Sequence, residues 1–415
     1  PLILMTEKLA VISLYDSFSA PPGTRVRNVE PIRKAHVQKI TSNIAIVGDD
    51  EWTAEDRIKR ISFGVRNSME LLRNHGKIDR LSMNRVGNED EKDDGLLLNI
   101  KANGMAVRLY YTAQYDKWGN EPREIEPRFE LEFDEAIQLG EHMDPMKQVV
   151  SFCSMALALP LTPFEIKISR RSLGEFKEDV ENRRPTGDHR ILYCLPEFKI
   201  DPSEVKVFGS PVNAYEEEGL DNLGKCLRVW LEKGSEWNDA YTLMMGAFMR
   251  RNEFGAERLL NACKWFEALP NSNPKQVIDK ETLNKIADAA VKAANGLGVS
   301  DIENRIKGSL RSIGQENRAL LFRRLIGLAW HSSPIPHPLD DMVSDLKGSQ
   351  HLRGKAAHGN LRTDGNGDTE KIMRYTGALE ALCMLLTVQD LPLSVEGRSR
   401  IQRNRIVQSY RLSGR

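Results

Sequence analysis

The sequence predicts an α+β protein in which an N-terminal β-rich domain is followed by an all-α helical bundle. One basis is length, because 415 residues are enough for two or three domains with sizeable cores. The other is apolar periodicity, because short alternating segments dominate the first half and helix-length segments follow. We therefore predict a β-rich domain at 1–215, a helical domain at 216–395 and a basic C-terminal tail at 396–415.

Strands in the first half are predicted from alternation and from turn signals. Residues 95–100 and 106–111 flank Asn103-Gly104, a dipeptide that favours a tight hairpin turn. Residues 128–133 alternate strictly between polar and apolar side chains, as a half-buried strand does. Three further strands are predicted, at 43–47, 164–168 and 191–195.

Helices are predicted from capping residues and from the spacing of apolar side chains. In the first half, Asp134 is expected to cap a helix that extends to Ala158. In the second half, Asp368 and Thr369 precede an apolar period and mark a helix start. The helices predicted in the second half are 220–231, 238–249, 254–269, 280–294, 301–313, 316–330, 339–358 and 369–388.

Composition and motif content argue against several classes of protein. Lys plus Arg and Asp plus Glu number 59 each, so a nucleic-acid partner would have to be met by a local patch. The five cysteines include no Cys-x2-Cys pair, which predicts reduced thiols in a cytoplasmic protein. No apolar run approaches the ~20 residues of a membrane span, and no phosphate-loop or dinucleotide-binding motif occurs. We expect no membrane association, no cofactor and no metal site.

The segment from His351 to Asn360 holds the best candidate for a functional site. Arg353 can hold a phosphate through a rigid fork of donors, and His358 can give or take a proton near neutral pH. Five residues correspond to about 140° around a helix axis, so these two side chains do not share one stripe. Arg353 must therefore reach around the helix or meet a histidine from another chain. The alternative is a solvated helix end with a histidine near its C-terminal dipole.

Three further polar residues of this segment are candidates for the same site. His351, Lys355 and His358 recur at i, i+4 and i+7, so they share one helix face. His351 and Lys355 are therefore candidates for binding phosphate, and simple solvation is the alternative. Asn360 is a candidate for lining the same cleft.

Four segments of the second half resemble the ApeA-like branch of the HEPN family, small α-helical domains found in many RNA-cleaving toxins and antiphage effectors. Residues 352–359 are similar to the family's Arg-x4–6-His signature with its following glycine. In the first half, residues 130–133, 149–152 and 160–164 resemble more loosely the domain that accompanies HEPN in such proteins and is regarded as a sensor or regulator. The other matching segments are 257–267, 317–328 and 372–388.

The resemblance implies a metal-independent endoribonuclease that serves antiphage defence by abortive infection. It also implies an RNA substrate, a phage-derived trigger and a homodimer in which each cleft combines Arg353 and His358 from both chains. Arg353 would stabilise charge that grows on the phosphate, and His358 would move protons. Glu267, in the first matching segment, is expected to hydrogen-bond Arg353 and orient it, with an ordinary surface acid as the alternative.

One position departs from the family pattern. The family commonly has a polar residue directly after the arginine, and here that residue is Gly354. This departure and the zero net charge slightly favour a second interpretation, a non-catalytic HEPN module that binds RNA or nucleotide or only mediates assembly. The position of the motif and the complete set of helices favour the enzyme more. Turnover of an RNA pool distinguishes the two interpretations, because only the enzyme produces it.

Overall fold

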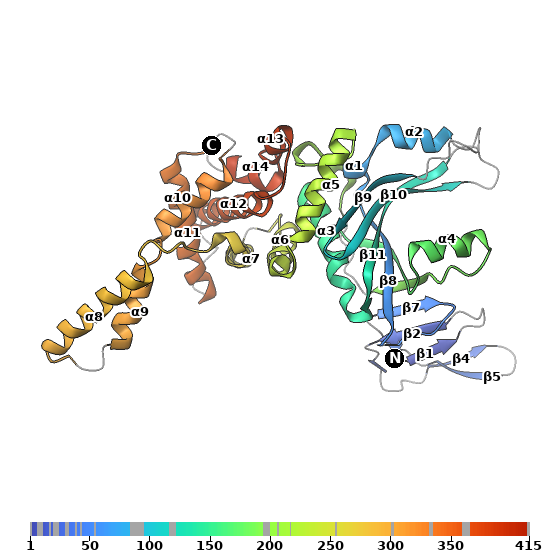
Figure 1. Cartoon of the computed structure of the whole chain (residues 1–415), viewed down its shortest axis with the longest axis horizontal. Helices are drawn as coiled ribbons and strands as arrows, with labels where there is room; N and C mark the ends of the chain where they lie inside the picture. The colour runs from blue at the N-terminus through green and yellow to red at the C-terminus, as the bar shows by residue number, and fades with distance from the viewer. Residues whose placement is uncertain are drawn as a thin grey trace. The chain divides into compact units, whose positions relative to one another are not determined.

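In the computed structural model the chain separates into two compact units (Figure 1). The first comprises residues 1–207 and 212–234, and the second comprises residues 208–211 and 235–415. The first is built on a β-sheet and the second is helical, so the predicted α+β class is confirmed. The structure describes residues 2–5, 11–15, 18–19, 25–29, 33–37, 40–41, 44–53, 55–83, 95–115, 122–193, 200–205, 207–215, 217–253, 255–299, 303–331, 335–358 and 366–412.

An antiparallel sheet forms the framework of the first unit, with nine strands among the described residues. In spatial order these are β1 (Leu2–Met5), β2 (Val11–Tyr15), β7 (Ile44–Gly48), β13 (His189–Tyr193), β12 (Pro163–Ser169), β8 (Arg57–Val65), β11 (Pro122–Gln138), β10 (Met105–Tyr115) and β9 (Leu96–Ala102). Two short antiparallel pairs lie outside this sheet, β3 (Phe18–Ser19) with β6 (Ile40–Thr41) and β4 (Arg25–Val29) with β5 (Arg33–Val37).

The hairpin predicted around Asn103-Gly104 is confirmed. β9 and β10 pair with Met105 opposite Ala102. Asn103 and Gly104 have φ angles of 46° and 68°, and two left-handed residues in this position match the twist of the flanking strands. The other strands predicted in this half overlap β7, β11, β12 and β13.

The helix predicted from Asp134 is wrong over its first turns, because the preceding strand continues. β11 extends to Gln138, and the Asp134 N–H donates to the Gly104 carbonyl at 2.8 Å. After a register shift, β11 resumes its pairing with β8, with Ile137 opposite Ile58. A short 3-10 turn, η2 (Leu139–Glu141), then leads into α3 (Met143–Leu157). Neighbouring strands therefore keep this segment extended.

The two faces of the sheet differ in chemistry. The apolar face is formed by buried side chains of β8 and β11: Ile61, Phe63, Phe129 and Leu131. α3 and α5 (Glu217–Glu232) lie on this side of the sheet, and α4 (Leu173–Glu181) lies on the other (Figure 1). Trp230 of α5 packs edge-on against Phe152 of α3, with ring centroids 5.8 Å apart. The other short helices of this unit are α1 (Met69–Leu72), α2 (His75–Met83) and η3 (Pro202–Glu204).

Helix α7 (Ala256–Ala268) lies at the centre of the second unit, against α6, α11 and α12. Trp265 packs edge-on against Phe248, and the Arg258 guanidinium donates to the Glu380 carboxylate at 3.0 and 2.7 Å. The other helices are η4 (Val207–Gly209), whose first residue belongs to the first unit, η5 (Ser235–Trp237), α6 (Asn238–Met249), η6 (Pro270–Ser272), α8 (Lys280–Gly296), α9 (Glu303–Ile313), α10 (Arg318–Ala329), α11 (Leu339–Ala357), α12 (Asn366–Val388), α13 (Val395–Ile401) and α14 (Arg405–Leu412). Each helix predicted between residues 238 and 388 overlaps one of these.

The units in the structure differ from the predicted domains in two places. α5 was assigned to the helical domain, but it belongs to the first unit because Trp230 packs on α3. The predicted basic tail, 396–415, contains most of α13 and all of α14. Tyr410 is fully buried there, and its O–H donates to Asp345 of α11 at 2.9 Å. The many arginines of this segment led to the prediction of a tail, although Ile406, Val407 and Tyr410 form a buried helix face.

Candidate functional site

Helix α11 exposes most of the candidate segment because the buried face of the helix ends at Leu352. The side chains that it buries recur every three or four residues: Met342, Val343, Asp345, Leu346, Ser349 and Leu352. The Nε–H of Arg374 of α12 donates to both carboxylate oxygens of Asp345, at 3.0 and 2.9 Å, which ties the helix to its neighbour. Beyond Leu352 no residue of α11 is buried, so the last turn is open to a ligand.

Arg353 is held by a carboxylate from a different helix. Its Nη2 donates to Oε2 of Glu267 at 3.0 Å, and its Nη1 donates to Oε1 of the same residue. The hydrogen bond predicted between these residues is therefore confirmed. The side chains are 39% and 45% exposed, so the pair lies at the surface. A guanidinium has five N–H donors, and this carboxylate accepts two, which leaves three for another anion.

The remaining candidates of the segment are exposed on the same helix end. His358 is the C-terminal capping residue of α11, and its backbone N–H donates to the Gly354 carbonyl at 3.3 Å. His351, Lys355 and His358 are all exposed, so the face that they share is open to solvent. Asn360 lies outside the described residues.

The structure does not bring Arg353 and His358 into contact within one chain. No hydrogen bond or ion pair joins these two described residues. This agrees with their separation of about 140° around the helix.

Cys263 of α7 lies close enough to feel the charges of the Arg353–Glu267 pair. Burial raises the pKa of its thiol to about 12, Arg353 lowers that pKa and Glu267 raises it. The thiol is therefore protonated at neutral pH and does not act as a nucleophile. Lys264 of α7 is exposed and was not predicted as a residue of this site. It lies three residues before Glu267 on the same helix, and residues at this spacing are neighbours on a helix surface, so the sequence could have indicated Lys264 as well.

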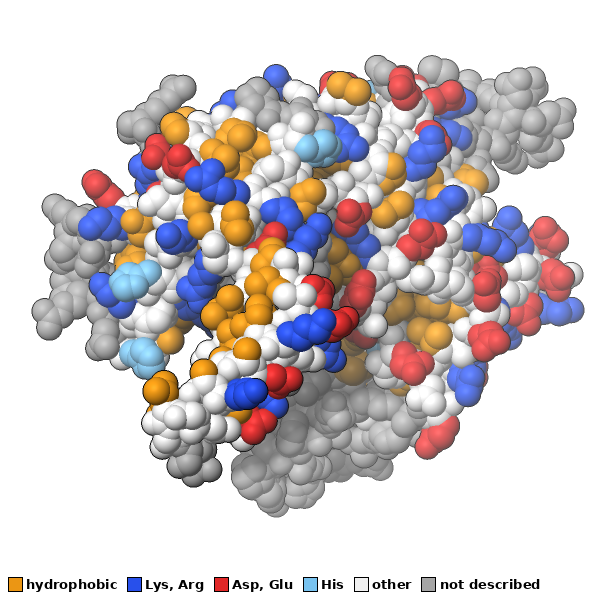
Figure 2. Space-filling model, turned by 60° about the vertical axis from the view of Figure 1, so that its left-hand side comes forward, with side chains coloured by type: hydrophobic (Ala, Val, Ile, Leu, Met, Phe, Trp, Pro, Cys, Tyr) orange, Lys and Arg blue, Asp and Glu red, His pale blue; other side chains and the backbone are white. Residues whose placement is uncertain are grey.

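Neither a metal-ligand cluster nor a membrane span is found in the described part of the chain. No three His, Cys, Asp or Glu side chains come together there in an arrangement that could hold a metal ion. None of its helices has both the length and the apolar character that spanning a bilayer requires. On the face drawn in Figure 2, Lys and Arg side chains are interspersed with Asp and Glu. A nucleic-acid site on this face would thus be a small positively charged patch and not the whole surface.

No protein-family model, no curated protein and no solved structure matches this chain. The resemblance to the ApeA-like HEPN family, and every role that it implies, therefore stays a hypothesis based on the quoted segments.

Proposed function

We propose that this protein is a metal-independent, cytoplasmic endoribonuclease of the HEPN type that serves antiphage defence by abortive infection. The observation that carries the proposal is the arginine fixed by Glu267 at an exposed helix end that also bears His358. A permanently charged guanidinium and exposed imidazoles on the same helix end are the groups that RNA cleavage by internal attack requires. In this proposal a phage-derived molecule triggers the activity.

The proposed reaction uses the ribose 2′-oxygen as the nucleophile. A histidine removes the 2′-OH proton, the 2′-oxygen forms a bond to phosphorus, and the bond to the 5′-oxygen breaks. A second imidazole protonates the departing 5′-oxygen, so the products carry a 2′,3′-cyclic phosphate and a 5′-hydroxyl. Arg353 donates to the non-bridging oxygens, where negative charge grows. His351 and Lys355 bind neighbouring phosphates.

The proposed active unit is a homodimer of the helical unit. Within one chain Arg353 and His358 point to different sides of α11. The proposed reaction uses two imidazoles, and each chain contributes one copy of His358. A two-fold axis beside this helix end would place both copies of each residue in a common cleft. This assembly supplies a base, an acid and a phosphate-holding group together.

Cleavage in the presence of a chelator tests the mechanism. The proposed chemistry uses only side chains, so the rate should be unchanged in excess EDTA and the products should carry cyclic phosphate ends. Loss of activity in EDTA that Mg²⁺ restores would rule the mechanism out.

Mixing the wild type with an inactive variant tests the composite cleft. Arg353→Ala and His358→Ala should each abolish cleavage. When wild type and His358→Ala are refolded together in equal amounts, a mixed dimer holds only one of the two imidazoles that the reaction uses. The rate per wild-type chain should therefore fall to about half, because half of the wild-type chains then pair with a variant chain. Matched controls are Arg323→Ala, which breaks another exposed ion pair on α10, and His331→Ala at the end of that helix. Both controls should keep wild-type activity, and a rate per wild-type chain that does not fall in the mixture would contradict the shared cleft.

A non-catalytic module that binds RNA or nucleotide, or only mediates assembly, is the second candidate function. It is favoured by Gly354 in place of a polar residue and by the zero net charge of the chain. Gly354 is exposed and a Cβ atom there would meet nothing within 4 Å, so Gly354→Asn is a suitable test of the missing polar group. If the missing polar group limits catalysis, this variant should cleave faster than the wild type. If neither protein cleaves RNA, purified or in phage-infected cells, the binding module is the better description.

A further inference from the structure

The side of the sheet that faces α4 carries charged side chains, although much of it is buried. On β8 and β11 every second residue points to this side, opposite the apolar face. Arg60, Arg128 and Glu130 are only 4%, 5% and 4% exposed. Charged residues are almost never buried to this degree unless they are paired.

These charges are all paired, in one connected group around Glu130 and one separate pair at Arg128. Glu130 accepts from Arg60 at 2.9 Å through one oxygen and from Arg108 at 3.2 Å through the other. Arg60 also donates to Asp188 at 2.6 Å. Arg128 donates to the Glu165 carboxylate at 2.9 Å. The arginines are therefore held in place before any ligand arrives, which lowers the entropy cost of binding one.

A cleft opens over these paired charges between the sheet and α4. Its volume is about 740 Å³, within the range of sites that hold small molecules. Phe176 of α4 lies on one side, with the Arg60 guanidinium 4.3 Å from its ring centre. On another side, the hydroxyls of Tyr110 and Ser62 are hydrogen-bonded to each other at 3.2 Å, and Asn99, opposite Arg108 in the sheet, also lines the cleft. Hydroxyl, amide, aromatic and charged groups thus converge on one space.

Stability alone does not account for this arrangement. Removing charges from water is costly, and a buried ion pair is often replaced by apolar residues with no loss of stability. Burial raises the pKa of Tyr110 and of the Asp188 carboxyl from their ordinary values. Groups with displaced pKa values that meet in a cleft are typical of functional sites.

Two lysines are the lining residues best placed to hold an anion. Five lining residues are cationic and four are anionic, and Glu132, which accepts from Arg108 at 2.8 Å, brings the number of carboxylates to five. Lys167 of β12 and Lys177 of α4 are exposed and stand outside the ion pairs that hold the arginines. Their ammonium groups are therefore the cations most available to a ligand. The charged residues that line the cleft are Arg60, Arg108, Arg128, Lys167 and Lys177, with Glu126, Glu130, Glu165 and Asp188.

We propose that this cleft binds a small phosphate-bearing molecule of nucleotide size. Lys167 and Lys177 hold its phosphate, and Asn99, Ser62 and Tyr110 supply hydrogen bonds to the rest of the molecule. Ammonium groups are common phosphate ligands in proteins, and the cleft has room for more than an inorganic anion. The proposal rests on the first unit alone and does not depend on the ribonuclease proposal.

Binding to the purified full-length chain tests the proposal. The probes are a set of nucleoside monophosphates, the matching nucleosides without phosphate, and inorganic phosphate. Thermal shift and calorimetry should detect at least one monophosphate. The double variant Lys167→Gln with Lys177→Gln should bind it about tenfold or more weakly, because it removes two charge-assisted contacts. Both lysines are exposed, so the variant should keep the circular dichroism spectrum of the wild type.

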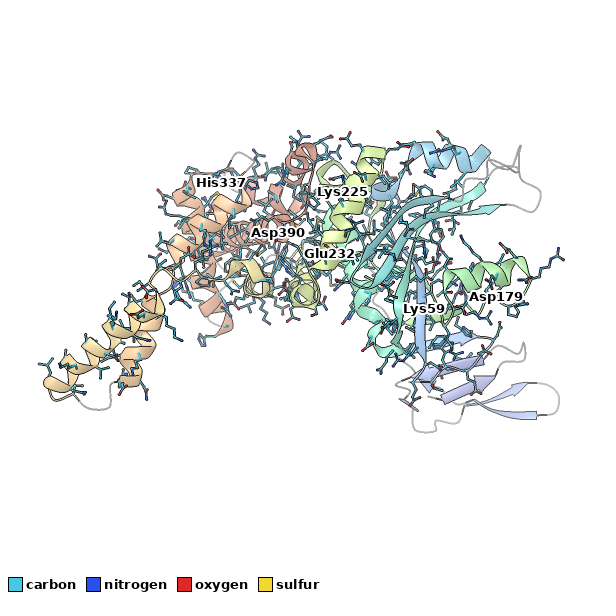
Figure 3. All side chains as sticks on the ribbon, viewed as in Figure 1. Lys59, Asp179, Lys225, Glu232, His337 and Asp390 are labelled. Carbon is cyan, nitrogen blue, oxygen red and sulfur yellow. The ribbon has the colours of Figure 1, made fainter. Side chains whose placement is uncertain are left out.

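Lys225→Gln is the matched control. Lys225 is an exposed lysine of α5, on the opposite side of the sheet from Asp179 of α4, and both are labelled in Figure 3. This variant should bind like the wild type. Three results would overturn the proposal: no monophosphate binds, the double variant binds as tightly as the control, or the nucleosides bind as tightly as their monophosphates. If inorganic phosphate raises the midpoint of thermal unfolding as much as a nucleoside monophosphate does, the assignment to a molecule of nucleotide size is overturned.

Discussion

Two ion pairs on α7 allow the effect of a residue on folding to be separated from its effect on function. Near the start of the helix, Arg258 pairs with Glu380, which is fully buried. At the end of the helix, Glu267 pairs with Arg353, and both side chains are about four-tenths exposed. The two pairs have the same chemistry in different surroundings. We predict that Glu380→Ala destabilises the second unit strongly, whereas Glu267→Ala reduces RNA cleavage with little loss of stability.

The expected magnitudes follow from exposure. Glu380→Ala leaves the buried Arg258 without its carboxylate, and breaking a buried pair in this way costs about 3–5 kcal/mol. For a unit of this size that corresponds to a fall of roughly 6–20 °C in the midpoint of thermal unfolding. An exposed pair such as Arg353–Glu267 contributes only about 0.2–1 kcal/mol. Its loss frees the guanidinium to move, and a displacement of about 1 Å can reduce a rate a hundredfold.

The assay combines urea unfolding of each variant with the initial rate of RNA cleavage. Glu267→Gln is a useful third variant, because it keeps the size of the side chain and removes the charge that aligns Arg353. It should fall between the wild type and Glu267→Ala in rate. The reasoning is refuted if Glu267→Ala unfolds as readily as Glu380→Ala, because the exposed pair would then be structural. It is also refuted if Glu267→Ala keeps the full rate while Arg353→Ala abolishes it.

Three further predictions concern stability. The hydrogen bond from Arg324 holds the pKa of the Glu316 carboxyl below its usual 4.5. This pair therefore stabilises the native state at neutral pH, and the stabilisation is lost as the pH falls through the lowered pKa of Glu316. Urea midpoints measured against pH should therefore fall more steeply on acidification for the wild type than for Glu316→Gln. Tyr410→Phe removes the hydrogen bond to buried Asp345 and should lower the free energy of unfolding by about 1.5 kcal/mol, whereas an unchanged value would mean that α14 does not anchor α11. Gly354→Ala should raise the free energy of unfolding by about 0.5 kcal/mol, because alanine is more favourable than glycine in a helix and the added Cβ meets no neighbour. A lower midpoint of thermal unfolding would contradict this prediction.

Part of the fold follows from local sequence. Asn103-Gly104 determines a hairpin because both residues accept left-handed backbone angles. The apolar spacing of residues 339–358 predicts α11 and places Leu352 on its buried face. The end of that face exposes the Arg353–His358 segment, so the candidate site was also locatable from sequence. These features depend on backbone preferences and on neighbours within one or two helical turns.

Tertiary structure decided the rest, because the groups involved lie far apart in the chain. Asp134 remains in a strand because β8 pairs with its extension some 80 residues away in sequence, as the match of Ile137 with Ile58 shows. Tyr410 makes an arginine-rich tail part of the core by meeting Asp345. Alternation along β11 indicated a polar side, but only packing beneath α4 buries that side and closes a cleft over Glu130. Local sequence determines which side chains share a face, whereas the partner of that face, water or another element, is determined by long-range packing.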